Sequence, residues 1–218
     1  MNGKRKLSYG EKPFLMNRDH WILLGAWSLF GLIHSIMAGK IVKNVCLTAM
    51  GGMYKYYRLI YSFIALISLS GVLAWQFFIK SAAVGQFPLL KWLVGIPAGV
   101  IGILLMGVSM NKYFFNLSGF GVFRGENSGE ILETSGMHRY VRHPLYLGTL
   151  LFVWSLFLYF PMLSNLLACI MITTYTLIGI RIEELKLLQE FGVDYARYRR
   201  ATPMLVPGIT SFRKTRGE

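Results

Sequence analysis

The feature that most constrains this chain is a series of apolar runs that approach the length needed to cross a lipid bilayer. A membrane-spanning helix requires about 20 predominantly apolar residues. Because lipid offers no partners to backbone polar groups, such runs must fold as helices. The sequence therefore predicts an all-α, multi-pass integral membrane protein with about five transmembrane helices. The expected spans are residues 21–38, 59–79, 89–110, 145–160 and 162–180.

Composition agrees with a membrane protein, because 54% of the 218 residues are hydrophobic and only 15% are charged. A formal net charge of +13 by itself raises the possibility of nucleic acid binding. The basic residues, however, lie between the spans and after the last one, as membrane topology predicts. We therefore expect membrane lipids, and not nucleic acid, as the surroundings of this chain.

The basic residues also predict an orientation. Most of the 23 Lys and Arg residues lie in segments 40–58, 112–142 and 181–216. The positive-inside rule places these segments in the cytoplasm, with the N-terminus outside and the C-terminus inside. The basic residues of the N-terminal segment oppose this assignment.

The chain is expected to form a single membrane domain, residues 1–218. Its parts are a polar tail at 1–20, three spans within 21–110, a glycine-containing loop at 111–142, a helical hairpin at 143–180, an amphipathic segment at 181–207 and a basic tail at 208–218. The hairpin is expected to be tight, because only a turn around Pro161 separates its helices. The amphipathic segment predicts a cytoplasmic helix, divided at Gly192, that lies in the interface or covers the neighbouring polar residues.

Two charged clusters flank the expected hairpin. The first is Arg142-His143-Pro144-Leu145-Tyr146-Leu147-Gly148, where the proline favours a helix start and free backbone amides add polarity. The second is Glu183-Glu184, and adjacent carboxylates at a membrane boundary are costly unless water, cations or a ligand meet them. These clusters predict a site at the cytoplasmic face. Lipid-phosphate contact by Arg142 and a solvated helix end at the glutamates remain open alternatives.

Three further side chains are candidates for a functional role. His34 lies inside the first span, where an ionisable residue is a functional candidate by default. A neutral imidazole hydrogen-bonded across helices is an equal alternative. Cys46 and Cys169 lack metal-ligand spacing, so we expect neither a disulfide nor a metal site.

Taken together, the motif at 142–148, Glu183-Glu184, and then Phe191-Gly192, Tyr195, Tyr198, Pro203 and Pro207 resemble the isoprenylcysteine carboxyl methyltransferase and phospholipid methyltransferase superfamily. The N-terminal half, with Leu32-Ile33-His34-Ser35 and Tyr57-Arg58-Leu59-Ile60-Tyr61, is similar to the NnrU-like branch. That branch is similar to membrane methanethiol methyltransferases and to nurim.

The resemblance implies S-adenosyl-L-methionine as the cofactor and an acceptor that enters from the bilayer. It implies cofactor contacts from His143, Pro144, Tyr146, Leu147, Gly148, Glu184, Tyr195 and Tyr198. Arg142 and Glu183 are the expected catalytic residues, which would hold or polarise the acceptor. A small thiol, an isoprenylcysteine-type carboxylate and a lipid all remain open as acceptors.

Two other functions also remain open. Sterol reductases carry a similar Arg-His-Pro-x-Tyr motif and transfer hydride from NADPH, but they usually have more spans, and the glutamate pair favours methyl transfer. A non-enzymatic NnrU-like or nurim-like protein would keep the scaffold for another purpose. Retention of the charged motif positions argues against that reading.

Overall fold

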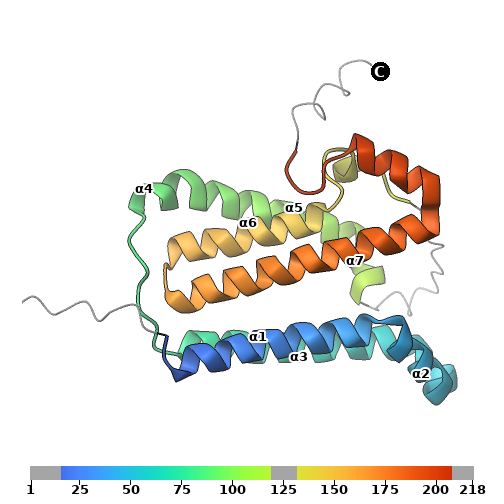
Figure 1. Ribbon diagram of the computed structural model, residues 1–218, viewed down its shortest axis with the longest axis horizontal. Coiled ribbons are helices and arrows are strands. Elements are labelled where there is room, and N and C mark those ends of the chain that lie inside the picture. The colour runs from blue at the N-terminus through green and yellow to red at the C-terminus, as the bar shows by residue number, and fades with distance from the viewer. Residues whose placement is uncertain (1–15, 119–131, 208–218) are drawn as a thin grey trace, which may run out of the picture.

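The computed structural model describes residues 16–118 and 132–207. Within these ranges the chain is helical apart from short connections and one antiparallel bridge between Ala83 and Met162. The helices are α1 (Arg18–Ala38), α2 (Lys40–Met50), the 3-10 helix η1 (Gly51–Tyr56), α3 (Tyr57–Phe78), α4 (Pro88–Leu90), the π-helix η2 (Lys91–Gly95), α5 (Ile96–Ser118), the 3-10 helix η4 (Gly136–Arg139), α6 (Pro144–Tyr159) and α7 (Leu163–Ala201). Figure 1 shows the long helices side by side along the longest axis.

Length and composition identify the helices that can cross a bilayer. Among the described residues, four stretches qualify: Arg18–Ala38, Lys40–Phe78, Pro88–Asn111 and Leu163–Ala201. The helix α6 is also apolar but has only 16 residues. Many large apolar side chains on these helices are exposed, as lipid-facing residues would be. The prediction of an all-helical membrane protein is therefore confirmed for the described part of the chain.

The helices α5 and α6 pack closely because glycines remove the side chains between them. A Cβ atom added at Gly102 would lie 2.7 Å from the carbonyl oxygen of Gly148. One added at Gly148 would lie 2.9 Å from the carbonyl oxygen of Gly102. Small residues at membrane helix contacts let the backbones approach in this way. The α5–α6 pair thus forms one closely packed side of the bundle.

The other helices are joined by an apolar core and a string of polar contacts. The core cluster consists of Leu23, Trp27, Val72 and Ala168, from α1, α3 and α7. The indole Nε1 of Trp27 donates to Oε1 of Gln76 over 3.2 Å. The Nε2 of Gln76 in turn donates to Oδ1 of Asn165 over 2.9 Å. These bonds connect α1 to α3 and α3 to α7, and they fix how the three helices sit against one another.

Three segments differ from the sequence-based expectation. Residues 40–58, expected as a polar connection, form α2 and η1 before α3 begins. The helix α5 extends to Ser118 and takes in the start of the expected loop at 111–142, whose residues 119–131 lie outside the described part. The last expected span and the amphipathic segment form one long helix, α7, which bends at Gly192 with φ 51° and ψ −118°.

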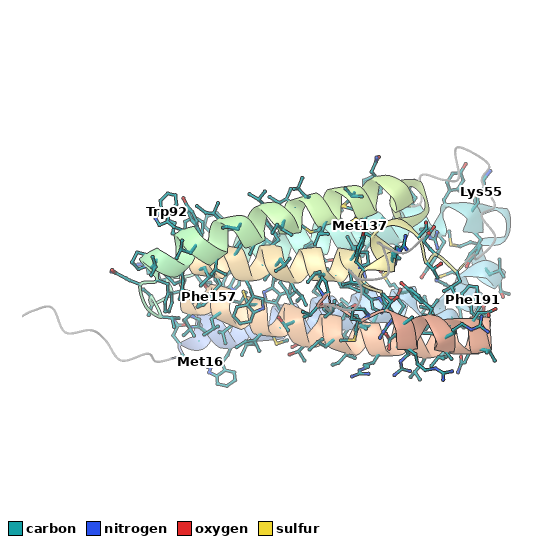
Figure 2. The ribbon with its side chains drawn as sticks, turned by 90° about the horizontal axis from the view of Figure 1, so that it is seen from above. Met16, Lys55, Trp92, Met137, Phe157 and Phe191 are labelled. Carbon is teal, nitrogen blue, oxygen red and sulfur yellow. The ribbon has the colours of Figure 1, made fainter. Side chains whose placement is uncertain are left out.

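Both charged clusters lie at the same end of the bundle. The start of α6, the second half of α7, and α2 gather at the right of Figure 1, where the last turns of α7 bend back toward α6. In Figure 2, Met137, Phe191 and Lys55 lie toward this end, whereas Met16 and Trp92 lie toward the other. The fold therefore brings the two motifs to one face of the membrane domain.

Candidate functional site

The site begins where the chain enters α6. His143 precedes the helix as its N-cap, and Pro144 is the first helical residue. Proline suits that position because its fixed φ matches the helix and its missing N–H would have had no partner there. The backbone N–H of Arg142 donates to the carbonyl of Pro203 over 2.9 Å, and that of His143 donates to Met204 over 3.2 Å. The entry to α6 is therefore paired with the chain that follows α7.

Arg142 and Glu184 form a buried ion pair. The Nε and Nη2 atoms of Arg142 donate to Oε1 of Glu184 over 2.8 and 2.5 Å, and the side chains are 8% and 3% exposed. Its Nη1 donates to the carbonyl of Arg199 over 3.0 Å and to that of Thr202. A buried ion pair is stable only where its remaining hydrogen-bonding groups are also satisfied. The carbonyls at the end of α7 meet that condition here.

His143 lies against this pair and is almost fully buried. Its Nε2 is 3.4 Å from Oε1 of Glu184, and its Nδ1 is 3.9 Å from Oε2 of Glu183. Burial lowers the pKa of His143, and the two neighbouring carboxylates oppose this shift only in part. The imidazole of His143 thus lies between two carboxylates, and burial favours its neutral form.

Glu183 is the accessible carboxylate of the site. Its side chain is 44% exposed, and its Oε2 accepts a hydrogen bond from the Tyr146 hydroxyl over 2.9 Å. Successive residues of an α-helix point about 100° apart, so α7 can direct Glu184 to Arg142 and Glu183 toward Tyr146. One carboxylate therefore stabilises the structure, and the other is open to a ligand.

Two tyrosines from the turns after Gly192 complete this region. Tyr195 is 1% exposed and lies beside the ion pair, and its hydroxyl has no hydrogen-bond partner of good geometry among the described residues. Tyr198 donates to the carbonyl of His138 over 2.6 Å, and the ring of His138 lies 3.0 Å from the carbonyl of Arg142. Tyr195 therefore offers a buried polar group, whereas Tyr198 fastens the loop before α6.

Two residues of the sequence motif, Leu147 and Gly148, contribute to the structure through a backbone hydrogen bond and through helix packing. The N–H of Leu147 donates to the carbonyl of His143 over 3.0 Å and closes the first turn of α6. Gly148 faces α5, where Gly102 and Met106 approach it. A cofactor contact at these two positions stays a prediction.

The sequence did not point to Arg199 or His138 as members of this region. The Nε of Arg199 is 3.5 Å from Oε2 of Glu184, and its side chain is 42% exposed. A basic residue in the last turn of a helix is common, so it carried no specific signal. On a straight helix Arg199 would lie about 22 Å from Glu184. The contact depends on the bend at Gly192.

Comparisons with known proteins agree with the motif. The family model for phospholipid methyltransferase matches residues 90–193. Methanethiol S-methyltransferase 2 of Bradyrhizobium diazoefficiens is 34% identical over 199 residues, which cover 86% of this chain and 73% of that protein. Methanethiol S-methyltransferase of Mycobacterium tuberculosis is 29% identical over 202 residues, covering 85% and 76%.

A second group of relatives matches over a shorter stretch. Protein-S-isoprenylcysteine O-methyltransferase of Schizosaccharomyces pombe is 35% identical over 86 residues, which cover 38% of this chain and 36% of that protein. No solved structure gives a significant match. Since a relative at 34% identity aligns along most of both chains, this chain belongs to the family of membrane methyltransferases that includes phospholipid, isoprenylcysteine and methanethiol methyltransferases.

Proposed function

We propose that this protein transfers the methyl group of S-adenosyl-L-methionine to a small thiol that enters from the bilayer. The observation that carries the proposal is the accessible Glu183 carboxylate, held beside the buried Arg142, Glu184 and His143. The relatives that align along most of the chain are named methanethiol S-methyltransferases. Two isoprenylcysteine methyltransferases align along 38% and 56% of it, so a prenylcysteine carboxylate is a less supported acceptor.

The side chains present fit this cofactor. S-adenosylmethionine carries a cationic sulfonium, a cationic amino group and a carboxylate. Glu183 and the ring of Tyr146 would hold a cationic group, and Arg199 would hold the carboxylate. The buried Tyr195 hydroxyl offers a further hydrogen bond. The accessible Glu183 carboxylate favours such a cofactor over NADPH, whose phosphates are anionic.

When bound, the cofactor supplies an electrophilic methyl group, and displacement at that carbon depends on alignment and exclusion of water. The chain provides alignment through Arg142 and Glu184, which hold the last turns of α7 against the start of α6. All three guanidinium nitrogens of Arg142 are engaged in this way. We therefore assign Arg142 to positioning, which argues for a thiol over a carboxylate acceptor.

We place the site at the cytoplasmic face, with α6 as a fifth membrane segment antiparallel to the first half of α7. Lys40 and Lys43 of α2 and the arginines at the end of α7 lie at the site end, as the positive-inside rule requires of a cytoplasmic face. A water-soluble cofactor is available there. The turns of α7 after Gly192 would then cover the site from the interface.

Calorimetry of cofactor binding to the purified protein in nanodiscs tests the proposal. The wild type is expected to bind S-adenosylmethionine saturably and not to bind NADPH. Glu183→Gln is expected to weaken binding by about tenfold or more, because a charge-assisted contact is lost. Asp194→Asn, an exposed carboxylate on the same helix, is the control and should leave binding unchanged. A folded protein that binds NADPH, or no S-adenosylmethionine, would overturn the assignment.

A further inference from the structure

A second polar cluster lies between the spans and away from the ion pair. The hydroxyl of Tyr61 in α3 is 2.7 Å from Nε2 and 2.9 Å from Nδ1 of His34 in α1. The ring centroids of Tyr175 in α7 and of His34 are 6.3 Å apart. The Tyr175 hydroxyl is 3.1 Å from Oγ of Ser35. We refer to His34, Ser35, Tyr61 and Tyr175 as the His34 cluster.

The cluster is held in place, yet it is not sealed within the protein. A Cβ atom at Gly31 would lie 3.0 Å from the ring of Tyr175, so the glycine is what lets that ring rest on α1. His34 and Tyr61 are only half-buried, and Tyr175 is 37% exposed. Polar groups within a membrane are costly unless they meet polar partners. Their accessibility suits a small ligand that arrives from the lipid.

The cluster also adjoins the proposed cofactor site. Tyr146, whose hydroxyl donates to Glu183, lies near Tyr61 and Tyr175. His34 stands in the last turns of α1, and Figure 1 shows that end of α1 at the same end of the bundle as the start of α6. Polar side chains thus continue from Glu183 through Tyr146 to His34.

We infer that the His34 cluster binds the thiol acceptor and that His34 accepts its proton. This inference rests on the proposed transfer of a methyl group to a thiol. A neutral imidazole has one nitrogen that can accept a proton, and the Tyr61 hydroxyl, within hydrogen-bond distance of both ring nitrogens, holds the ring in place. The thiolate is the reactive form of a thiol, so a base beside the sulfur is needed.

The step balances with the groups named. The thiol proton passes to a ring nitrogen of His34 while the sulfur forms a bond to the cofactor's methyl carbon. The bond from that carbon to the sulfonium sulfur breaks, and its electron pair remains on that sulfur. The products are a methyl sulfide, a demethylated cofactor whose sulfur is an uncharged thioether, and a protonated His34, which releases its proton to water before the next turnover.

Binding of a thiol to the cofactor-free protein is the first test. The four histidines, labelled with ¹³C in their rings, are followed by NMR in nanodiscs during titration with a short alkyl thiol. We expect the signal that His34→Gln removes to shift on titration. We expect His34→Gln to raise the dissociation constant by about tenfold. A shift confined to His143, or no shift at all, would overturn the inference.

Acceptor acidity supplies the second test. His34→Gln should lower methylation of an alkyl thiol by about 100-fold or more, as expected on removal of a general base. It should spare an acidic aromatic thiol that is already ionised at the assay pH. Tyr61→Phe keeps the ring and should also lower methylation of the alkyl thiol more than that of the acidic thiol, but to a smaller degree. This variant tests the inference if His34→Gln does not fold. Tyr159→Phe, near the opposite end of α6, is the matched control.

The outcomes separate this inference from the proposed function. If both variants lose activity equally toward both thiols while cofactor binding is unchanged, the cluster is a structural link between helices and the inference is wrong. In that case methyl transfer to thiols still stands. If the wild type binds cofactor but methylates neither thiol, the thiol acceptor and this inference are both overturned.

Discussion

Arg142 and Glu184, 42 residues apart in sequence, meet at a single carboxylate oxygen that accepts hydrogen bonds from both Nε and Nη2 of the arginine. Neither side chain is accessible enough for water to replace the other as a partner. The pair joins the entry of α6 to the last turns of α7. The ion pair therefore fixes the position of His143 and of the residues around that histidine.

Removing the glutamate is expected to leave a buried positive charge without a counter-charge. Glu184→Ala should lower the free energy of unfolding by about 3–5 kcal/mol, measured by denaturation in detergent. Asp194→Ala removes the exposed pair with Arg197 on the same helix, where the side chains are 74% and 76% exposed. That control should cost less than about 1 kcal/mol. Equal losses in the two variants would contradict a structural role for Glu184.

The contact of α5 with α6 depends on a missing side chain. A methyl group at Gly102 would enter the backbone of α6 at Gly148, so Gly102→Ala should separate the helices. We expect a loss of about 1–3 kcal/mol in unfolding free energy. Gly107→Ala, on the same helix with nothing within 4 Å of the added Cβ, should be neutral or stabilising. Similar destabilisation by both changes would refute this close packing.

The bend in α7 depends on a backbone conformation that side chains oppose. At Gly192, φ is 51° and ψ is −118°. Gly192→Ala should therefore cost about 1–3 kcal/mol, or straighten the helix and weaken cofactor binding. Gly179→Ala lies in regular helix with open space around its Cβ and serves as the control. Unfolding curves and calorimetry of both variants test this, and unchanged values for Gly192→Ala would argue against the bend.

Acidification should weaken the site through His143. Burial holds the pKa of this imidazole below its ordinary value of 6.5, so the folded protein binds fewer protons there than the unfolded chain. Its contribution to stability is complete above pH 6.5 and declines as pH falls through the lower folded pKa. Unfolding measured from neutral to mildly acidic pH should show this decline. His143→Gln should lack that part of the decline, and an identical profile would contradict the assignment.

The sequence predicted the long helices well because bilayer thickness sets their length. The expected span at 59–79 lies in α3, Tyr57–Phe78, and that at 145–160 lies in α6, Pro144–Tyr159, each within two residues. The sequence did not predict α2, whose 11 residues are too few for a span and include two lysines typical of a connection. The α5–α6 contact was also missed, although the spacing of glycines in α5 carries a signal for close packing.

The sequence predicted which residues lie near one another in the site, but not which of them form hydrogen bonds and ion pairs. The sequence brought Arg142 and His143 to the same face as the glutamate pair, and the structure places them in contact. Which glutamate meets Arg142 depends on the rotation of α7 about its axis, and two adjacent residues do not reveal that. The contact of Arg199 with Glu184 depends on the bend at Gly192. The direction of α7 after this bend is set by tertiary packing, so the sequence alone did not predict the contact.

Because Arg142 pairs with the end of α7, the site can assemble only late in the synthesis of the chain. A growing chain is synthesised from its N-terminus, so α6 is made well before the carbonyls of Arg199 and Thr202, which lie 57 and 60 residues after Arg142. Until those residues emerge from the ribosome, Glu184 can reach Arg142, but the carbonyl partners of the arginine Nη1 are missing. A product that stopped at residue 180 would retain the membrane helices but not an assembled site.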